Sequence, residues 1–213
     1  MKKIVVLVSG HGSNLQALID ACHSGQIAGK IVAVISNQAE AYALERAQSA
    51  SIPSKVFLRK DFANNRAMDE QIGHYIESVQ ADLIVLAGYM KILSPAFTQR
   101  FAGKILNIHP SLLPKYPGLN TYQQALDAGE REHGTSVHFV NEEVDAGAVI
   151  LQAKVPIFAE DRIKNIEQRV KAQELRIYPL VVKWFVEERL TLIGEHAFLD
   201  GKQLPPQGYA MEE

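Results

Sequence analysis

The sequence has little cysteine, little net charge and no long apolar run, and each shortage excludes a class of protein. Cys22 is the only cysteine among 213 residues, so no internal disulfide can form, as suits a reducing cytoplasm. The 22 Lys and Arg residues nearly balance 24 Asp and Glu residues, with no basic run to neutralise a nucleic-acid backbone. The first apolar stretch ends at Ser9, too short for a signal peptide, and no other run approaches the roughly 20 residues that span a bilayer. We therefore expect a cytoplasmic protein that binds neither nucleic acid nor membrane.

Short β-branched runs alternate with longer amphipathic segments in the first half of the chain. Strands are predicted at 3–8, 31–35, 54–58, 83–86 and 105–108, and helices at 14–23, 39–50, 65–79 and 95–101. Solidly apolar strands that alternate with helices are typical of a parallel sheet covered on both faces.

The second half has a different pattern. Helices are predicted at 121–128 and 163–188, strands at 136–140 and 149–155, and a hairpin around Asp200-Gly201 within 190–204. Pro179 is expected to break or kink the long helix. The predicted fold is α/β, a three-layer α/β/α, Rossmann-like, mostly parallel sheet with an antiparallel C-terminal extension. We expect a single domain over 1–213, with a phosphate-binding half at 1–108 and a second half at 109–213.

The turn after the first strand has the composition of an anion site. Gly10, Gly12, Ser13 and Asn14 separate the first strand from the first helix, where helix N-termini attract anions. Leu15 stands where a dinucleotide fingerprint needs its third glycine, and the Gly-Lys-Ser/Thr of a P-loop is absent. The turn is therefore expected to bind a smaller phosphorylated ligand. The alternative is a capped turn that binds no ligand.

The fifth predicted strand ends in two polar residues, Asn107 and His109, which project to the same side because strand side chains alternate. An amide can donate to a developing oxyanion, and an imidazole can transfer protons near neutral pH. Asp145 is the best acidic candidate to orient His109, although its acidic segment could also be a solvated turn. The chain has no His-Glu-x-x-His, cysteine cluster or Gly-x-Ser-x-Gly, so we expect no metal and no serine nucleophile.

Five segments resemble one enzyme family: SGHGSNL at 9–15, AGYMKIL at 87–93, LNIHPSLLPKYPG at 106–118, HGTSVHF at 133–139 and LPPQGY at 204–209. The third segment marks the wider formyltransferase superfamily. Together the five resemble the phosphoribosylglycinamide formyltransferases, and the resemblance runs essentially end to end. It implies transfer of a formyl group from the co-substrate 10-formyltetrahydrofolate to the amine of glycinamide ribonucleotide, in purine (IMP) biosynthesis. These two small molecules are the expected partners of a monomer or homodimer without a metal.

The resemblance also implies roles for individual residues. The catalytic group would be Asn107, His109 and Asp145. The ribonucleotide would be bound by Gly12, Ser13, Asn14 and Glu174. The folate would be bound by Arg66, Met90, Lys91, Ile92, Leu93, Asn107, Asn141, Glu142, Glu143, Val144 and Asp145. Ala146 replaces a glycine that is usual in the family, which places a Cβ where unusual backbone torsions are expected.

Two other functions stay open at this stage. One is another formyl-folate enzyme, either a formyltetrahydrofolate hydrolase or a methionyl-tRNA formyltransferase. The hydrolase would carry an N-terminal regulatory domain and the tRNA enzyme a basic C-terminal domain, and we expect neither here. The other is a non-catalytic sugar-phosphate-binding module, which gives no reason for Asn107 and His109 to share a strand end.

Overall fold

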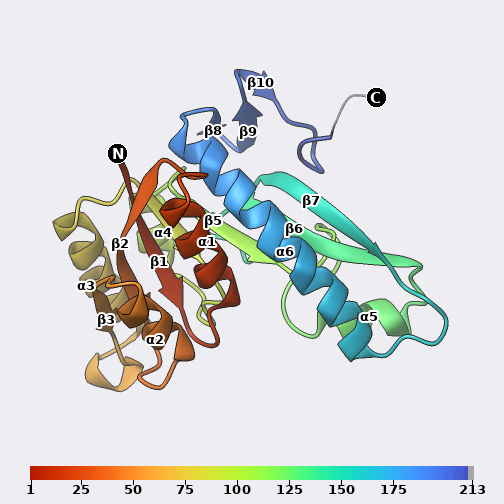
Figure 1. Cartoon of the computed structure of the whole chain (residues 1–213), viewed down its shortest axis with the longest axis horizontal. Helices are drawn as coiled ribbons and strands as arrows, with labels where there is room; N and C mark the ends of the chain where they lie inside the picture. The colour runs from red at the N-terminus through yellow and green to blue at the C-terminus, as the bar shows by residue number, and fades with distance from the viewer. Residues whose placement is uncertain (211–213) are drawn as a thin grey trace. The chain divides into compact units, whose positions relative to one another are not determined.

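Two sheets organise residues 1–210, the part of the chain that the computed structural model describes. The larger sheet has seven mostly parallel strands in the order β3-β2-β1-β4-β5-β6-β7, and the smaller has the order β10-β9-β8 (Figure 1). The predicted α/β class with an antiparallel C-terminal extension is therefore confirmed. The chain divides into two compact units, Met1–Asn107 and the residues from Ile108 on, and each is described by itself.

Parallel strands and their connecting helices build the first unit. Its elements are β1 (Lys2–Val8), α1 (Ser13–His23), β2 (Gly29–Ser36), α2 (Tyr42–Ser49), β3 (Ser54–Val56), η1 (Arg59–Asp61), α3 (Asn65–Ser78), β4 (Leu83–Leu86) and α4 (Pro95–Arg100), followed by β5 (Ile105–His109), which crosses the boundary. α1 contacts α2 and α3 contacts α4, as right-handed crossovers on opposite faces require. β1 pairs in parallel with both β2 and β4, and its residues from Ile4 on are buried, which explains its continuous apolar sequence.

The place where the sheet changes direction positions the first candidate segments. The chain builds outward from β1 to β3 and then returns to add β4 on the other side of β1. β1 and β4 therefore flank a topological switch point, where ligands of open α/β sheets bind. The turn after β1 and the segment 87–94 after β4 both leave from this edge.

Antiparallel strands and one long helix dominate the second unit. Its elements are α5 (Thr121–Asp127), β6 (Glu132–Phe139), β7 (Val149–Pro156), α6 (Ile163–Val186), β8 (Leu190–Ile193), β9 (His196–Leu199) and β10 (Lys202–Gln203). α6 lies along β6 and β7 and contacts both, with Ile166 and Val170 packed against Val155 (Figure 1). The β6–β7 pair and the stretch before it carry the second set of candidate residues.

Three predictions about these elements need correction. β6 begins at Glu132 rather than at residue 136, because Gly134 allows close approach of backbones: a Cβ there would lie 2.0 Å from the Ala153 carbonyl oxygen. α6 passes through Pro179 without ending, since burial of its apolar stripe outweighs a proline penalty of roughly 3 kcal/mol. The tail contains a second turn at Gly194, between β8 and β9, that the sequence did not reveal.

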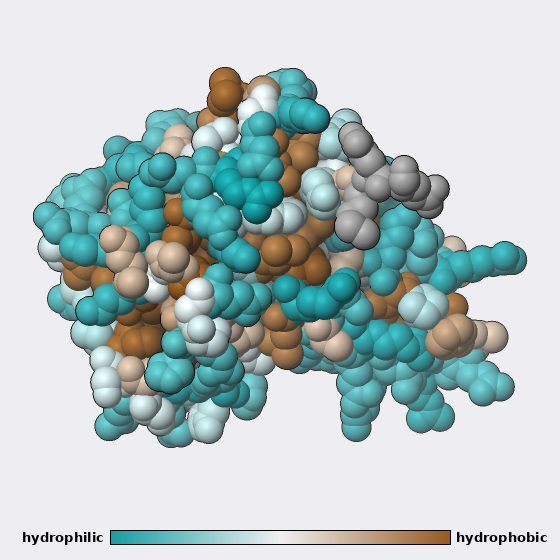
Figure 2. All heavy atoms as spheres, turned by 45° about the horizontal axis from the view of Figure 1, so that its top comes forward, coloured by the Kyte–Doolittle hydropathy of each residue, from teal (hydrophilic) through white to brown (hydrophobic). Residues whose placement is uncertain are grey.

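Some large apolar side chains are exposed. Hydrophilic side chains cover most of the face in Figure 2, with smaller hydrophobic patches between them. Apart from Met1, the most exposed large apolar residues are Leu119, Ile92 and Met90, at 71%, 69% and 68%. Ile92 and Met90 lie in the segment AGYMKIL that the sequence singled out. Within residues 1–210, no helix combines the length and apolar character needed to cross a membrane.

Candidate active site

The turn between β1 and α1 leaves the start of the helix open to an anion. Gly12 is the residue before α1 and has a left-handed φ of 81°, and a Cβ on it would lie 2.6 Å from the Ala43 Cβ. Ser13 and Asn14 lie inside the first helical turn, and the cap residue Gly12 has no side chain that could make a cap bond. The N-terminus of α1 thus has the character that favours an anion.

Arg46 on α2 holds this turn from one side. Its Nε donates to the His11 carbonyl oxygen at 2.9 Å, and its Nη2 lies 2.8 Å from the His11 Nε2. The guanidinium also stacks over the Tyr42 ring at 4.9 Å. These contacts fix the turn and place a permanent positive charge beside it, which favours an anionic ligand.

The segment after β4 contains the expected folate residues Met90 to Leu93. The Met90 N–H donates to the Ser9 hydroxyl at 2.7 Å, which ties this segment to the turn after β1. Met90 and Ile92 project outward, whereas Leu93 is buried and the Lys91 ammonium pairs with Asp69. A folate contact by Lys91 would therefore use its backbone. Arg66 is exposed in the first turn of α3.

Asn107 and His109 lie two residues apart on β5, as predicted. Asn107 is half-buried and His109 is 6% exposed. The His109 Nε2–H donates to the Tyr116 carbonyl oxygen at 2.8 Å, so this nitrogen carries the proton. The Thr135 hydroxyl donates to the His109 carbonyl oxygen at 2.9 Å and fixes the backbone on the other side. The imidazole is thus held at the end of an apolar strand by its neighbours.

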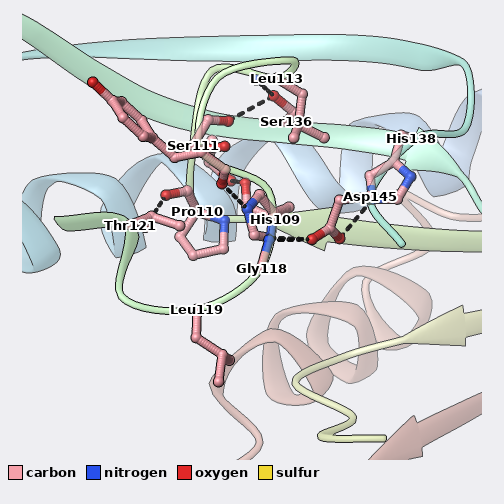
Figure 3. A network of polar contacts seen from close by, with 12 residues as sticks. His109, Pro110, Ser111, Leu113, Gly118, Leu119, Thr121, Ser136, His138 and Asp145 are labelled. Atoms are coloured by element: carbon pink, nitrogen blue, oxygen red, sulfur yellow. Dashed lines mark hydrogen bonds and ion pairs between the residues drawn. The ribbon is translucent and has the colours of Figure 1, made fainter. Parts of the chain in front are cut away.

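Asp145 faces His109 from the β6–β7 connection (Figure 3). Its Oδ2 lies 3.5 Å from the His109 Nδ1 and accepts the Gly118 N–H at 2.8 Å. The carboxylate side chain is only 10% exposed, whereas Glu142 and Glu143 on the same connection are exposed. The solvated-turn interpretation therefore fits its neighbours but not Asp145, which has the position of an orienting group.

His138 is a part of this cluster that the sequence did not reveal. Its Nδ1–H donates to the Phe139 carbonyl oxygen at 2.8 Å, and its Nε2 lies 3.9 Å from the Asp145 Oδ1 (Figure 3). Complete burial lowers the pKa of His138. The available signal was its place near the end of β6, next to the connection that carries Asp145. Residues 1–210 contain no cluster of three His, Cys, Asp or Glu side chains suited to a metal.

The connection 141–148 also forms one wall of a cleft of about 970 Å³. Asn141 to Asp145, the residues expected to border the folate, all line it, and so do His196 and Pro205. Glu174 is half-buried on α6. Burial raises the pKa of Tyr122 and of Tyr178, and the negative charge of Glu174 adds to both shifts.

Comparison with known proteins gives one consistent family. A family model described as formyl transferase matches residues 2–182. The phosphoribosylglycinamide formyltransferase of Haemophilus influenzae is 68% identical over 212 residues, covering 100% of both chains, and that of Escherichia coli is 56% identical, covering 99% of both. The solved structure of the Coxiella burnetii phosphoribosylglycinamide formyltransferase, in complex with CHES, has a TM-score of 0.95 at 46% identity and 99% coverage of both chains. The chain belongs to the phosphoribosylglycinamide formyltransferase family.

The departure at Ala146 from the usual phosphoribosylglycinamide formyltransferase sequence is harmless to the backbone. The left-handed torsion in this connection falls on Asp145, with φ 54°, and not on Ala146, so the expectation of unusual torsions there is wrong. Aspartate tolerates this region better than most residues do. The following Gly147 is the constrained position, because a Cβ there would lie 1.7 Å from the Phe139 carbonyl oxygen.

We expect Gly147→Ala to destabilise this formyltransferase by about 2–3 kcal/mol, because the β6–β7 connection must shift to admit the methyl group. The matched control is Ala146→Gly, which removes a methyl group that nothing crowds and should cost only about 0.4–1 kcal/mol through the unfolded chain. Urea denaturation of the three proteins measures both values. Equal losses in the two variants would contradict the close contact at Gly147.

Proposed function

We propose that this chain transfers the formyl group of 10-formyltetrahydrofolate to the amine of glycinamide ribonucleotide. The observation that carries the proposal is the buried His109–Asp145 pair, at the end of a strand in a formyltransferase chain. A new bond forms between the substrate amine and the formyl carbon, and the bond from that carbon to the folate nitrogen breaks. The amine loses a proton and the folate nitrogen gains one, so no oxidant or metal is required.

Asn107 and His109 are proposed to stabilise the oxyanion that forms when the amine attacks. An amide N–H and an imidazole N–H are the donors that such an oxyanion needs, and both residues sit on one face of β5. Asp145 would stabilise the positive charge that develops on His109 and hold the ring in one orientation. The substrate amine must attack in its neutral form, so activity should fall as acid protonates it.

The His109 N–H group proposed to donate to the oxyanion already makes a hydrogen bond in this structure. This Nε2–H points at the Tyr116 carbonyl oxygen, in the stretch that follows β5. To donate to an oxyanion, the imidazole must give up this bond, either by turning or by movement of the stretch that contains Tyr116. We therefore propose that substrate binding and rearrangement of this stretch are coupled.

Gly12, Ser13 and Asn14 are proposed to bind the ribonucleotide phosphate. The proposal is supported by the N-terminus of α1, whose cap residue Gly12 has no side chain, and by the positive charge of Arg46. Glu174 is proposed to contact the glycinamide end. A carboxylate suits that role because the substrate amine is cationic before it loses its proton.

The folate is proposed to contact two sets of residues. The first is Arg66 with the segment Met90, Lys91, Ile92 and Leu93, and the second is Asn107 with the connection Asn141, Glu142, Glu143, Val144 and Asp145. The exposed Met90 and Ile92 support the first set, because apolar side chains suit the rings of a pterin. We propose that residues 1–213 act as one domain, since β5 continues across the boundary between the units.

The test is to follow the loss of 10-formyl-5,8-dideazafolate by absorbance, with and without glycinamide ribonucleotide. Turnover that requires the ribonucleotide supports the proposal. Equal consumption of the folate without it identifies a hydrolase. Binding of ribonucleotide without turnover identifies a sugar-phosphate-binding module.

Asn107→Ala tests the first of the two proposed oxyanion donors. Loss of one such donor typically costs about 10²–10³ in rate, and we expect the lower end because the half-buried Asn107 acts in a partly solvated environment. The measurement is kcat at saturating concentrations of both substrates, with thermal unfolding as the control for the fold. Wild-type turnover in a folded variant would remove Asn107 from the mechanism.

A further inference from the structure

Asp69 is a buried carboxylate that no step of the proposed reaction uses. It lies on α3 and is 1% exposed. A carboxylate without water is costly unless partners replace its hydration. The identity of those partners therefore indicates what the fold gains from keeping this residue.

Both oxygens of Asp69 contact one short segment. Oδ1 pairs with the Lys91 ammonium, and Oδ2 accepts the Ser94 N–H at 2.7 Å. Ser94 also caps α4 from the position before its first residue, where its hydroxyl accepts the Phe97 N–H at 3.3 Å. Asp69 consequently fixes the far end of the segment at the point where it turns into a helix.

The near end of the same segment has its own polar anchor. The Ser9 hydroxyl accepts the Met90 N–H at 2.7 Å and donates to the Asn37 Oδ1 at 2.6 Å. The segment from Met90 to Leu93 is thus held at both ends, although it belongs to neither a helix nor a strand. Between the two anchors, the side chains of Met90 and Ile92 are 68% and 69% exposed and so are accessible to a ligand.

We infer that Asp69 is a positioning residue, which holds the Met90–Leu93 segment in the shape that binds the formyl-folate donor. The inference rests on the proposed function, because that function assigns the donor to this segment. Asp69 acts through Lys91 and Ser94 and touches no reacting atom. Its loss should therefore weaken donor binding and leave the chemical step and the ribonucleotide unaffected.

Asp69→Asn is the decisive variant, because it keeps the shape of the side chain and removes the charge that pairs with Lys91. We expect the KM for 10-formyl-5,8-dideazafolate to rise about tenfold. Without the Asp69 carboxylate, one or two side chains of the segment would have to become ordered when the donor binds, which weakens binding. The kcat and the KM for glycinamide ribonucleotide should stay within about twofold of wild type. Direct binding of the dideazafolate, followed by fluorescence without ribonucleotide, should weaken by the same factor.

Glu77→Gln is the matched control. Like Asp69→Asn, it removes a carboxylate of α3 from an ion pair, here with Arg100 of α4, but this pair is exposed and does not include a residue of the segment. Asp69→Glu retains a carboxylate that can pair with Lys91 and should bind the donor more tightly than Asp69→Asn does. Lys91→Met removes the partner instead and should weaken donor binding as Asp69→Asn does, which keeps the test valid if Asp69→Asn does not fold.

An unchanged donor KM in Asp69→Asn, with only a lower melting temperature, would overturn the inference by showing a purely structural ion pair. A similar rise in donor KM in Glu77→Gln would also overturn it, since the effect would then be nonspecific. If the wild-type protein neither binds nor consumes the dideazafolate, the proposed function itself fails. The two failures are therefore distinguishable in the same set of measurements.

Discussion

His109→Ala is expected to lower kcat by on the order of 10³-fold, with the fold retained. One imidazole is proposed both to donate to the oxyanion and to move protons, and general acid–base catalysis alone contributes about 10²–10⁴. The backbone at this position is held by the Thr135 hydroxyl and by strand pairing rather than by the side chain. Steady-state kinetics at saturating substrates measure the loss, and circular dichroism verifies the fold.

The control for His109→Ala is another histidine of similar burial. His133 is 2% exposed on β6 and has no role in the proposed reaction. His133→Ala should lose stability in the same way but retain most of its turnover. If both variants lost activity equally, the effect would come from disturbed packing, and His109 would lose its catalytic assignment.

The presence of the parallel strands and the first candidate residues could be predicted from the sequence because their signals are local. β4 was predicted residue for residue, since a buried parallel strand reads as an uninterrupted apolar run between polar neighbours. Asn107 and His109 followed from the alternation of one strand, and Gly12 from the requirements of one turn. In each case the physical cause lies within a few residues of its effect.

The partners of these residues depend on contacts between distant parts of the chain, which a single sequence does not display. Asp69 reads as an ordinary polar residue on a helix, and only the fold brings Lys91 and Ser94 to it. His138 belongs to the site only because Asp145, on the β6–β7 connection, lies beside it. The left-handed torsion of Asp145 was not predicted from the sequence. Pro179 fails as a helix breaker for the same reason, because packing on β6 and β7 decides the outcome.

Asp145→Asn is expected to lower kcat by about 10³–10⁴, the loss seen when the acid of a His–Asp pair becomes an amide. The amide can still accept the Gly118 N–H through its oxygen, so the β6–β7 connection should keep its shape. What disappears is the negative charge 3.5 Å from the His109 Nδ1, which would otherwise balance the positive charge that develops on the imidazole. The KM for glycinamide ribonucleotide should change little, because the lost interaction strengthens only in the transition state.

Asp127→Asn separates this effect from a general change in charge. Asp127 is exposed on α5 and accepts a hydrogen bond from Gln123 at 2.7 Å, away from His109, and its variant should turn over like wild type. The double variant His109→Ala/Asp145→Asn should be scarcely slower than His109→Ala alone, because an orienting carboxylate has nothing left to orient. Losses that multiply in the double variant would mean that Asp145 acts on the substrate directly, and its assignment would change from a partner of His109 to an independent catalytic group.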